Sequence, residues 1–393
     1  MKYTIQILLS LLTILSANLF GQSTKKPEKQ ISFAKEHKTH SYYVEQGELW
    51  WQELQKDSTS ENNWYNYYRA CRNAQGTNDW KDDFLKESPA MKLGDDIVVL
   101  MKKHIPNTFT CYYVSGSTGG VEPSAGKDLL KAYEMNPDFE GIDSDVVTLA
   151  QSTFDTLLRQ KVNKKWFSKN NFSIGLLNYA YNVLMSVEKN AILLTEHDND
   201  SYPIWMLQDA KEIRKDVTVI NIDFLLLDSY REKVFGELNI IPINLQSHDI
   251  NNYGLNWEAV VNHILQNYKN PKPLYLAQTL NPNLYKNFLN KLFISGLTFK
   301  LSEKPMNLAN KNRELIEDKF LLDYLKMGFT DDISQNSVNS QNLNYIKSLK
   351  LVYEDLKKNK LFDKAQKLKK YAFLIADNQK DDKMIVEIKN MFK

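Results

Sequence analysis

The middle of the chain alternates short apolar runs with longer stretches of helical periodicity, and this alternation constrains the fold most strongly. The apolar runs cover residues 191–194, 217–222, 274–277 and 297–301. The helical stretches between them cover residues 203–213, 257–268 and 282–293. Strands and helices that alternate at these spacings form parallel sheets with right-handed crossover connections. We therefore expect an α/β fold at 188–305, with a small parallel sheet and crossover helices.

Both flanks of this region carry helical patterns. Trp64, Tyr67, Tyr68 and Cys71 recur at the spacing of one helix face. We interpret this face as packing between two helices; the alternative is an exposed aromatic platform for carbohydrate. Residues 353–365 resemble a single tetratricopeptide-type helix–turn–helix, without a continuing repeat. We expect tetratricopeptide-like helical segments at both ends of the mature chain, in residues 37–187, with one strand near 108–114, and in residues 306–393.

The first residues have the pattern of a secretory signal peptide. Lys2 precedes an apolar run from Ile5 to Leu15, and Gly21 offers a small residue for cleavage. The run is shorter than the ~20 residues of a membrane span; an uncleaved anchor is the alternative. We expect residues 1–21 to be removed and residues 22–36 to form a flexible leader. The mature protein is then secreted or periplasmic, with no stable membrane span after cleavage.

Composition narrows the function classes. With 50 Lys and Arg against 48 Asp and Glu, the net charge of +2 does not favour nucleic-acid binding, which requires a basic surface. Cys71 and Cys111 are the only cysteines, too few for a disulfide scaffold. In an oxidising compartment they form either one disulfide or two buried thiols. A glycine-rich segment that ends at Gly126 and Lys127 lacks the spacing of a phosphate-binding loop. No cofactor is predicted.

The segment after the first apolar run is the candidate site. Residues 195–203 have the sequence TEHDNDSYP and join a predicted strand to a predicted helix. In parallel sheets such loops lie at the carboxyl ends of the strands, where ligands bind. Asp223 and Gln278 follow neighbouring apolar runs and would complete a crevice. The ligand-binding candidates from this pattern are Thr195, His197, Asp198, Asn199, Asp200, Asp223 and Gln278.

A structural role is the alternative for this turn. Asp and Asn side chains bond their own backbone in turns, and Asp200 or Ser201 precedes Pro203 as an N-cap would. We expect capping to be the main role of the turn and ligand binding to be secondary. A metal site is disfavoured because His197 has no second histidine at ligand spacing. No catalytic residue and no metal ligand is predicted.

The turn and the residues after it resemble a known family. Residues 195–205 are similar to the pattern T-x-G-D-N-D-T-F-P-x-W of a Bacteroidetes membrane-protein family related to protein O-mannosyltransferases. His197 stands at the position of the family's glycine. The resemblance covers residues 191–393, the family's soluble extramembrane portion, and adds Trp205 to the candidates. It implies a periplasmic accessory domain without transferase activity, because this chain lacks the membrane helices expected to carry that chemistry.

These features lead to two hypotheses for function. The first is a secreted or periplasmic, non-catalytic interaction or accessory protein of the cell envelope, which binds a protein partner or a glycan. The alternative is an envelope glycan-processing or sugar-binding protein that uses the crevice at Asp198, Asn199 and Asp200. A cytosolic nucleotide-binding protein is disfavoured by the leader and the failed phosphate loop. Carboxylates that converge on an open pocket would favour the alternative, whereas carboxylates that only cap backbone favour the first hypothesis.

Overall fold

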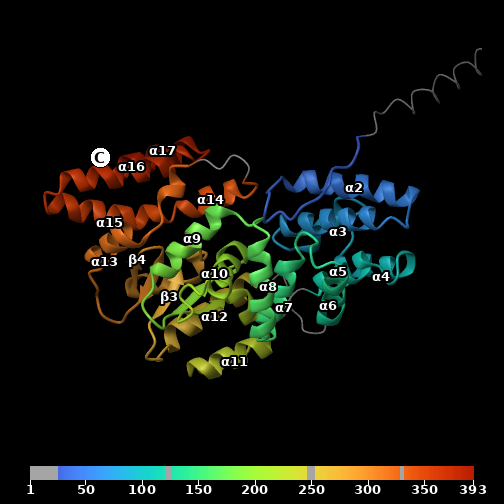
Figure 1. Ribbon diagram of the computed structural model, residues 1–393, viewed down its shortest axis with the longest axis horizontal. Helices are drawn as coiled ribbons and strands as arrows, with labels where there is room; N and C mark the ends of the chain where they lie inside the picture. Colours follow the sequence, from blue (N-terminus) through green and yellow to red (C-terminus); the bar gives the residue numbers. More distant parts are fainter. Residues whose placement is uncertain (1–24, 120–124, 246–252, 328–331) are drawn as a thin grey trace, which may run out of the picture.

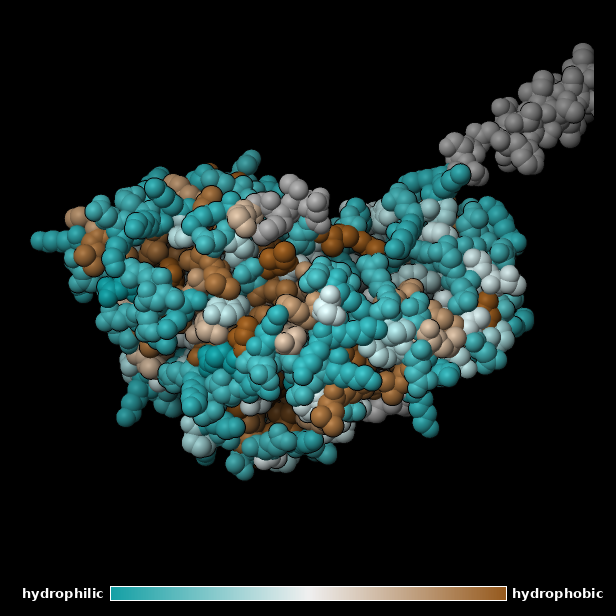
Figure 2. Space-filling view, in the orientation of Figure 1, coloured by the Kyte–Doolittle hydropathy of each residue, from teal (hydrophilic) through white to brown (hydrophobic). Residues whose placement is uncertain are grey.

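A computed structural model describes residues 25–119, 125–245, 253–327 and 332–393. The predicted signal peptide, residues 1–21, lies outside these ranges. Figure 1 shows the amino-terminal helices at one end of an elongated molecule and the carboxyl-terminal helices at the other end, next to the sheet. Hydrophilic side chains cover most of the face seen in Figure 2. Among the described residues, no helix is long and apolar enough to cross a membrane. The predicted α/β class with helical flanks is confirmed.

The amino-terminal part is helical. Its helices are α2 (His40–Lys56), α3 (Glu61–Gly76), α4 (Gly94–His104), α5 (Phe109–Thr118), α6 (Gly126–Met135), α7 (Ile142–Ser152), α8 (Thr156–Ser168) and α9 (Ile174–Met185). Trp64, Tyr67, Tyr68 and Cys71 are at most 2% exposed, and α3 packs on α2. The aromatic face of α3 is therefore a packing face, and the alternative of a carbohydrate platform is wrong. Cys71 and Cys111 are both buried, free thiols.

The expectation of a strand near 108–114 is wrong, because this segment forms α5. The Thr108 hydroxyl caps the helix by accepting the Cys111 N–H at 3.2 Å. Phe109 and Tyr113 stack along the helix with ring centroids 5.8 Å apart. Tyr113 and Val114 are completely buried, where α5 packs against α3, α4 and α6. Tertiary packing thus overrides the β-propensity of the Thr, Tyr and Val residues.

The sheet has five strands in the order β2-β1-β3-β5-β4. The strands are β1 (Ile192–Thr195), β2 (Thr218–Asn221), β3 (Leu274–Ala277), β4 (Leu292–Ser295) and β5 (Thr298–Leu301). β1 lies parallel to β2 and to β3, as predicted. β5 runs antiparallel to both of its neighbours. The positions of all four predicted strands are confirmed, but the expectation of a wholly parallel sheet is wrong at the β5 end.

The prediction of a helix at 282–293 is also wrong. The segment forms two short 3-10 turns, η5 (Pro282–Leu284) and η6 (Lys286–Lys291), and then enters β4. A tight hairpin joins β4 to β5 through Gly296, which has φ of +58°, a conformation that glycine adopts without strain. The Gly296 N–H donates to Asn312 Oδ1 at 2.6 Å. Pairing with β5, not local periodicity, therefore decides the structure of this segment.

Crossover helices and a helical end complete the fold. The crossover elements are α10 (Asp198–Lys211), η3 (Ile222–Leu226), α11 (Asp228–Leu238) and α12 (Tyr253–Asn267). The carboxyl-terminal elements are α13 (Ala309–Glu314), η7 (Leu315–Lys319), η8 (Asp323–Leu325), α14 (Gln335–Asn342), α15 (Tyr345–Lys358), α16 (Phe362–Asp377) and α17 (Asp382–Met391). α15 and α16 pack on each other as the predicted helix–turn–helix, and α17 packs on α16 (Figure 1).

The expectation of a flexible leader is wrong for residues 25–36, which bond to α2 and α3. Gln30 is 2% exposed, and its N–H donates to Asn66 Oδ1 at 2.7 Å. The Asn73 amide donates to the Ile31 carbonyl at 2.8 Å, and Trp50 Nε1 donates to the Glu28 carbonyl at 2.9 Å. Side chains of the two helices thus satisfy the backbone of a segment that forms no helix or strand of its own.

Candidate functional site

The candidate residues lie at the carboxyl ends of three neighbouring parallel strands. The turn 196–197 joins β1 to α10, η3 follows β2, and residues 278–281 follow β3. α10 begins at Asp198, five residues earlier than the predicted start at Pro203. Ligands bind at this edge of the sheet in open α/β folds, and the loops that carry the candidate residues lie there.

The turn contains a strained histidine. His197 has φ of +62° and ψ of −178°, a combination that glycine adopts readily and other residues rarely. Its N–H donates to Asp223 Oδ2 at 3.0 Å, and its Nδ1 lies 3.1 Å from the same oxygen. Asp223, in η3 after β2, therefore holds both the backbone and the ring of His197 in place.

His197 is a cation at neutral pH in this arrangement. Desolvation by its surroundings lowers the pKa of His197, but the hydrogen bond to Asp223 and the charges of Asp223, Glu196 and Asp198 outweigh it and raise that pKa to about 9. The side chain is 63% exposed, and its ring meets the Trp257 ring edge-on, with centroids 5.8 Å apart. A charged imidazole beside an indole is thus available at the surface.

Asp200 organises the turn from inside. It is 4% exposed, and its Oδ2 accepts the Glu196 N–H at 3.0 Å. Burial raises the pKa of Asp200 to about 7, because an ionised carboxylate loses hydration in the interior. Its position and its backbone partner are those of a structural residue. The predicted capping role is wrong, because α10 begins at Asp198 after His197 and has no side-chain cap, so Asp200 stabilises the turn and does not cap the helix.

Glu196 connects the β1 loop to the β3 loop, and the sequence analysis did not single it out. The side chain is buried, and its Oε2 accepts the Asn281 N–H at 2.6 Å. Burial raises its pKa, against the opposing effects of His197 and the Asn281 hydrogen bond. The signal available in the sequence was its place between Thr195 and His197, but its partner lies 85 residues away.

Thr195 belongs to a buried hydroxyl network. Its Oγ1 lies 2.7 Å from Ser201 Oγ, which also accepts the Asn221 amide at 3.0 Å. Asn221 Oδ1 in turn accepts the Asp223 N–H at 2.7 Å. The hydroxyls of this network are paired with each other and with an amide, not with a base that would activate a nucleophile. This network ties the ends of β1 and β2 together.

Asn199 links the turn to both helical flanks. Its Nδ2 donates to the Ala34 carbonyl at 3.1 Å, and its carbonyl accepts Gln341 Nε2 of α14 at 3.2 Å. Pro203 explains the second bond, because proline has no N–H to donate to the carbonyl four residues earlier. The side chain of Gln341 supplies the donor that Pro203 lacks.

Asp198 is the exposed carboxylate of the turn. Partial desolvation and the nearby Asp223 raise its pKa, and His197 lowers it. Asp145 of α7 and Arg72 of α3 also act on this pKa, so the carboxylate lies within electrostatic range of the amino-terminal helices. Asp198 and His197 together form the accessible polar part of the candidate site.

Two predicted candidates do not reach this surface. Trp205 is completely buried and stacks on Phe224 with centroids 6.0 Å apart. Gln278 is 4% exposed, and its amide donates to the Gly296 carbonyl at 3.0 Å, which fixes the β4–β5 hairpin. In the described part of the chain, no group of three or more His, Cys, Asp or Glu residues is arranged to hold a metal ion.

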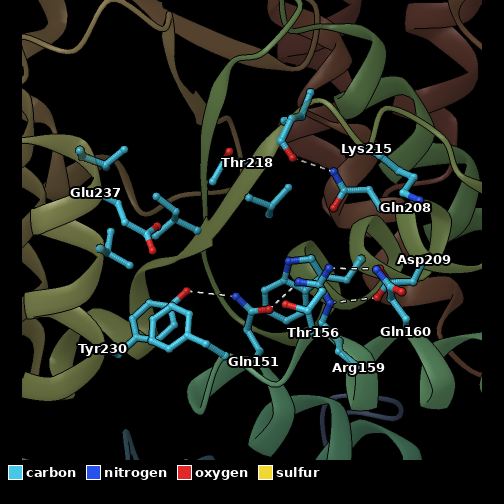
Figure 3. A pocket seen from close by; sticks show the side chains of 17 residues that line it. Gln151, Thr156, Arg159, Gln160, Gln208, Asp209, Lys215, Thr218, Tyr230 and Glu237 are labelled. Carbon is cyan, nitrogen blue, oxygen red and sulfur yellow. Dashed lines mark hydrogen bonds and ion pairs between the residues drawn. The ribbon is translucent and has the colours of Figure 1, made fainter.

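A separate cavity of about 310 Å³ lies beside β2 (Figure 3). Trp205 is one of the residues that line it. The others come mainly from β2, α8, α10 and α11, and Figure 3 shows Tyr230 and Glu237 on one side, with Arg159 and Asp209 on the other. Sequence analysis missed this cavity because its lining residues are spread from 151 to 238 without a shared motif.

Comparison with known proteins gives one match. Residues 176–253 match the family model described as TMEM260-associated domain 2. This range contains most of α9 and all of β1, α10, β2, η3 and α11, and therefore every predicted candidate except Gln278. It supports a likeness to an O-mannosyltransferase-like family over this part of the chain; residues 254–393 of the predicted resemblance lie outside the match. No curated protein and no solved structure matches the chain.

Proposed function

We propose that the chain is a non-catalytic accessory protein of the bacterial cell envelope, secreted or periplasmic, which binds a protein partner or a glycan. The observation that carries this proposal is the use of carboxylates around the turn. Asp200, Asp223 and Glu196 each accept a backbone N–H, at 3.0, 3.0 and 2.6 Å. Such bonds fix the loops, and the burial of Asp200 and Glu196 keeps these two carboxyls from direct contact with a ligand.

The exposed part of the turn supports a role in binding. Asp198 and the cationic His197 present opposite charges at the surface, on a backbone held by bonds to Ala34 and Gln341. A rigid support for a few polar groups lowers the entropy cost of binding. The apolar run from Ile5 to Leu15 supports export. The likeness of residues 176–253 to TMEM260-associated domain 2 supports the resemblance to an O-mannosyltransferase-like family from which we infer the envelope setting.

Recovery of partners from envelope fractions tests this proposal. The affinity-tagged full-length protein is expressed in a bacterium, recovered from the envelope, and its bound proteins and glycans are identified by mass spectrometry. We expect the variant His197→Ser/Asp198→Asn to retain ~10-fold less partner, the loss that about 1.4 kcal/mol of binding energy produces. Asp363→Asn, an exposed acid on α16, serves as the matched control and should bind as the wild type does.

A second candidate function is sugar binding or processing at the same turn. The observation that favours it is the Trp257 ring beside the charged His197, since an aromatic edge next to polar groups suits a carbohydrate. Incubation of the purified protein with envelope oligosaccharides, followed by mass spectrometry, separates the two functions. Cleavage that disappears in Asp198→Asn would overturn the non-catalytic proposal, whereas unchanged oligosaccharides support it.

A further inference from the structure

The cavity beside β2 lies along the edge of the sheet. β2 is the terminal strand in the order β2-β1-β3-β5-β4. Four consecutive residues, 217–220, line the cavity. Side chains of consecutive residues point to opposite faces of a sheet, so a cavity that reaches all four meets the strand at its edge.

The backbone of β2 has an open position at this edge. The Thr218 N–H donates to the Ala191 carbonyl at 2.9 Å, on the β1 side. Backbone groups of successive strand residues alternate in direction, and the parallel register pairs Val219 with Leu193, so the N–H and C=O of Val219 point away from β1, to the cavity side. Within the described chain, neither group has a hydrogen-bond partner. An unpaired strand edge is a template for another extended chain.

Neighbouring side chains limit this open position to a short length. The Val217 carbonyl accepts Gln208 Nε2 at 2.9 Å, which closes one end of the edge. α11 and the start of α8 contribute Tyr230 and Thr156 as walls. The cavity behind these walls has a volume of about 310 Å³, within the range of ligand pockets and far below the volume of a second globular copy.

The charged side chains that line the cavity are two cations, Arg159 and Lys215, and two anions, Asp209 and Glu237, so their charges balance. Arg159 also binds Asp209 through two hydrogen bonds of 2.9 and 3.1 Å. Aromatic surface is also present: Phe154 and Tyr230 stack with centroids 4.7 Å apart. The completely buried Trp205 has an Nε1 without a hydrogen-bond acceptor in the described residues. A neutral, hydrogen-bonding ligand with apolar side chains fits these walls better than an anion or a cation.

We propose that the edge of β2 binds an extended, uncharged peptide segment of a partner protein, which adds a strand beside Val219. Strand addition of this kind gains main-chain hydrogen bonds from the edge and specificity from side-chain pockets. At about 3.3 Å per residue, the segment that lies along residues 217–220 has about four residues. The inference rests on the proposed function in one respect, since it names the kind of segment that a protein partner contributes. That segment makes a second contact at the β2 edge, in addition to the partner's contact at the Asp198 turn.

The test uses the full-length protein and a displayed library of random heptapeptides. Selected peptides are synthesised with a fluorescent label, and their affinity is measured by fluorescence polarisation. Val219→Pro removes the outward N–H and leaves the β1 ladder intact, since proline is tolerated on edge strands. Ile294→Pro on β4, the opposite terminal strand of the same sheet, is the matched control. Thr218→Trp, at an exposed side chain that lines the cavity, fills the cavity and keeps the ladder.

We expect peptides without charged residues to be selected, and both Val219→Pro and Thr218→Trp to weaken them at least ~10-fold, with Ile294→Pro unchanged. Thermal melts verify that each variant is folded. If Val219→Pro does not fold, the peptide affinity of Thr218→Trp alone tests the inference. Equal affinity in wild type and Thr218→Trp would overturn the inference. Three other results would also overturn it. The first is that no peptide is selected. The second is that the protein binds an oligosaccharide on an array and Thr218→Trp abolishes that binding, and the third is that the protein sediments as a dimer that Thr218→Trp dissociates. Partner recovery that fails in His197→Ser/Asp198→Asn but persists in Thr218→Trp would leave the proposed function standing without this inference.

Discussion

At the scale of single residues, the turn after β1 depends on a histidine in a conformation that suits glycine. His197 gains bonds to Asp223 through its N–H and its ring, while its backbone carries strain at φ of +62°. Strain of this kind persists where the surrounding structure holds the residue in place, and it is found most often at functional positions. Glycine, which stands at this position in the pattern of the similar family, would adopt the same backbone conformation without strain.

A comparison of two substitutions measures this strain. His197→Gly and His197→Ala both remove the ring, but only glycine relaxes the backbone, so we expect His197→Ala to be less stable than His197→Gly by about 1 kcal/mol. Urea denaturation gives the two free energies of unfolding. The control is Lys370, an exposed residue in the middle of α16, where helix propensity predicts the opposite order, with alanine more stable than glycine by about 1 kcal/mol. An alanine variant of His197 that is as stable as the glycine variant would contradict the strain.

The buried carboxyl of Asp200 makes stability depend on pH. Its pKa is about 7 in the folded state, against an ordinary aspartate value of 3.8, so between these pH values the folded protein holds a proton that the unfolded chain has lost. Stability from this group is present below about pH 4 and falls as pH rises to about 7, by at most ~4 kcal/mol at 1.36 kcal/mol per unit. Asp200→Asn keeps an acceptor for the Glu196 N–H and removes the titration.

Urea denaturation of wild type and Asp200→Asn at several pH values checks this prediction. The stability difference between the two proteins should shift in favour of the asparagine variant from pH 4 to pH 7 and stay constant above pH 7. His197 is present in both proteins, so its own titration largely cancels in the difference. Parallel stability curves across this range would show that Asp200 ionises normally.

The two cysteines offer a third test at this scale. Burial raises the pKa of the Cys71 thiol to about 11, and Cys111 is buried as well, so neither forms a reactive thiolate near neutral pH. We expect no reaction of the native protein with Ellman's reagent at pH 8, and two thiols per chain after denaturation without reductant. Fewer than two thiols after denaturation would indicate a disulfide in the mature protein.

At the scale of secondary-structure elements, a proline inside α10 couples that helix to α14. Pro203 leaves the Asn199 carbonyl without a helical donor, and Gln341 Nε2 donates to this carbonyl instead, at 3.2 Å. α10 therefore depends on a side chain 142 residues away. This bond also fixes the position of the carboxyl-terminal helices relative to the candidate turn.

A double-mutant cycle tests the coupling. Gln341→Met removes the donor at similar volume, and we expect it to cost about 1 kcal/mol, because a partly buried carbonyl loses its hydrogen bond. Pro203→Ala restores a backbone N–H for the same carbonyl, so Gln341→Met should cost much less in that background. A coupling energy of roughly 0.5–1 kcal/mol from thermal or urea denaturation is expected. Additive effects would mean that Gln341 does not replace the missing N–H.

At the scale of the whole molecule, the turn after β1 joins three parts of the chain. Asn199 bonds to Ala34, 165 residues before it, and to Gln341, 142 residues after it. The segment 25–36 is itself held by side chains of α2 and α3. A change in the turn thus affects both helical flanks at once, which suits a rigid binding scaffold.

Export is a prediction for the whole chain. The charge at Lys2 and the apolar run from Ile5 to Leu15 match a signal peptide, so we expect cleavage after Gly21 and accumulation outside the cytoplasm. Intact-mass spectrometry of the protein from a bacterial host gives the mature amino terminus. Replacement of Leu11 and Leu12 by Arg should keep the full-length chain in the cytoplasm. A secreted form with an intact Met1 would contradict cleavage.

The sequence by itself determined the features that depend on neighbouring residues. The helical spacing of Trp64, Tyr67, Tyr68 and Cys71 specified a buried helix face, and short apolar runs located four of the five strands. The polar turn at 195–200 was recognisable because parallel strands place such turns at one edge of the sheet. These inferences use spacings of a few residues, within which helix and strand periodicity is expressed.

Only the tertiary structure decided the features that depend on distant partners. Residues 109–118 are helical because they pack among α3, α4 and α6, and residues 292–295 are a strand because β5 pairs with them. Glu196 and Asn199 have roles set by residues at least 85 positions away, and the open edge at Val219 exists because β2 is the last strand of the sheet. Local propensity amounts to tenths of a kcal/mol per residue, whereas burial of one large side chain contributes about 1.5–3 kcal/mol, so long-range packing prevails where the two disagree.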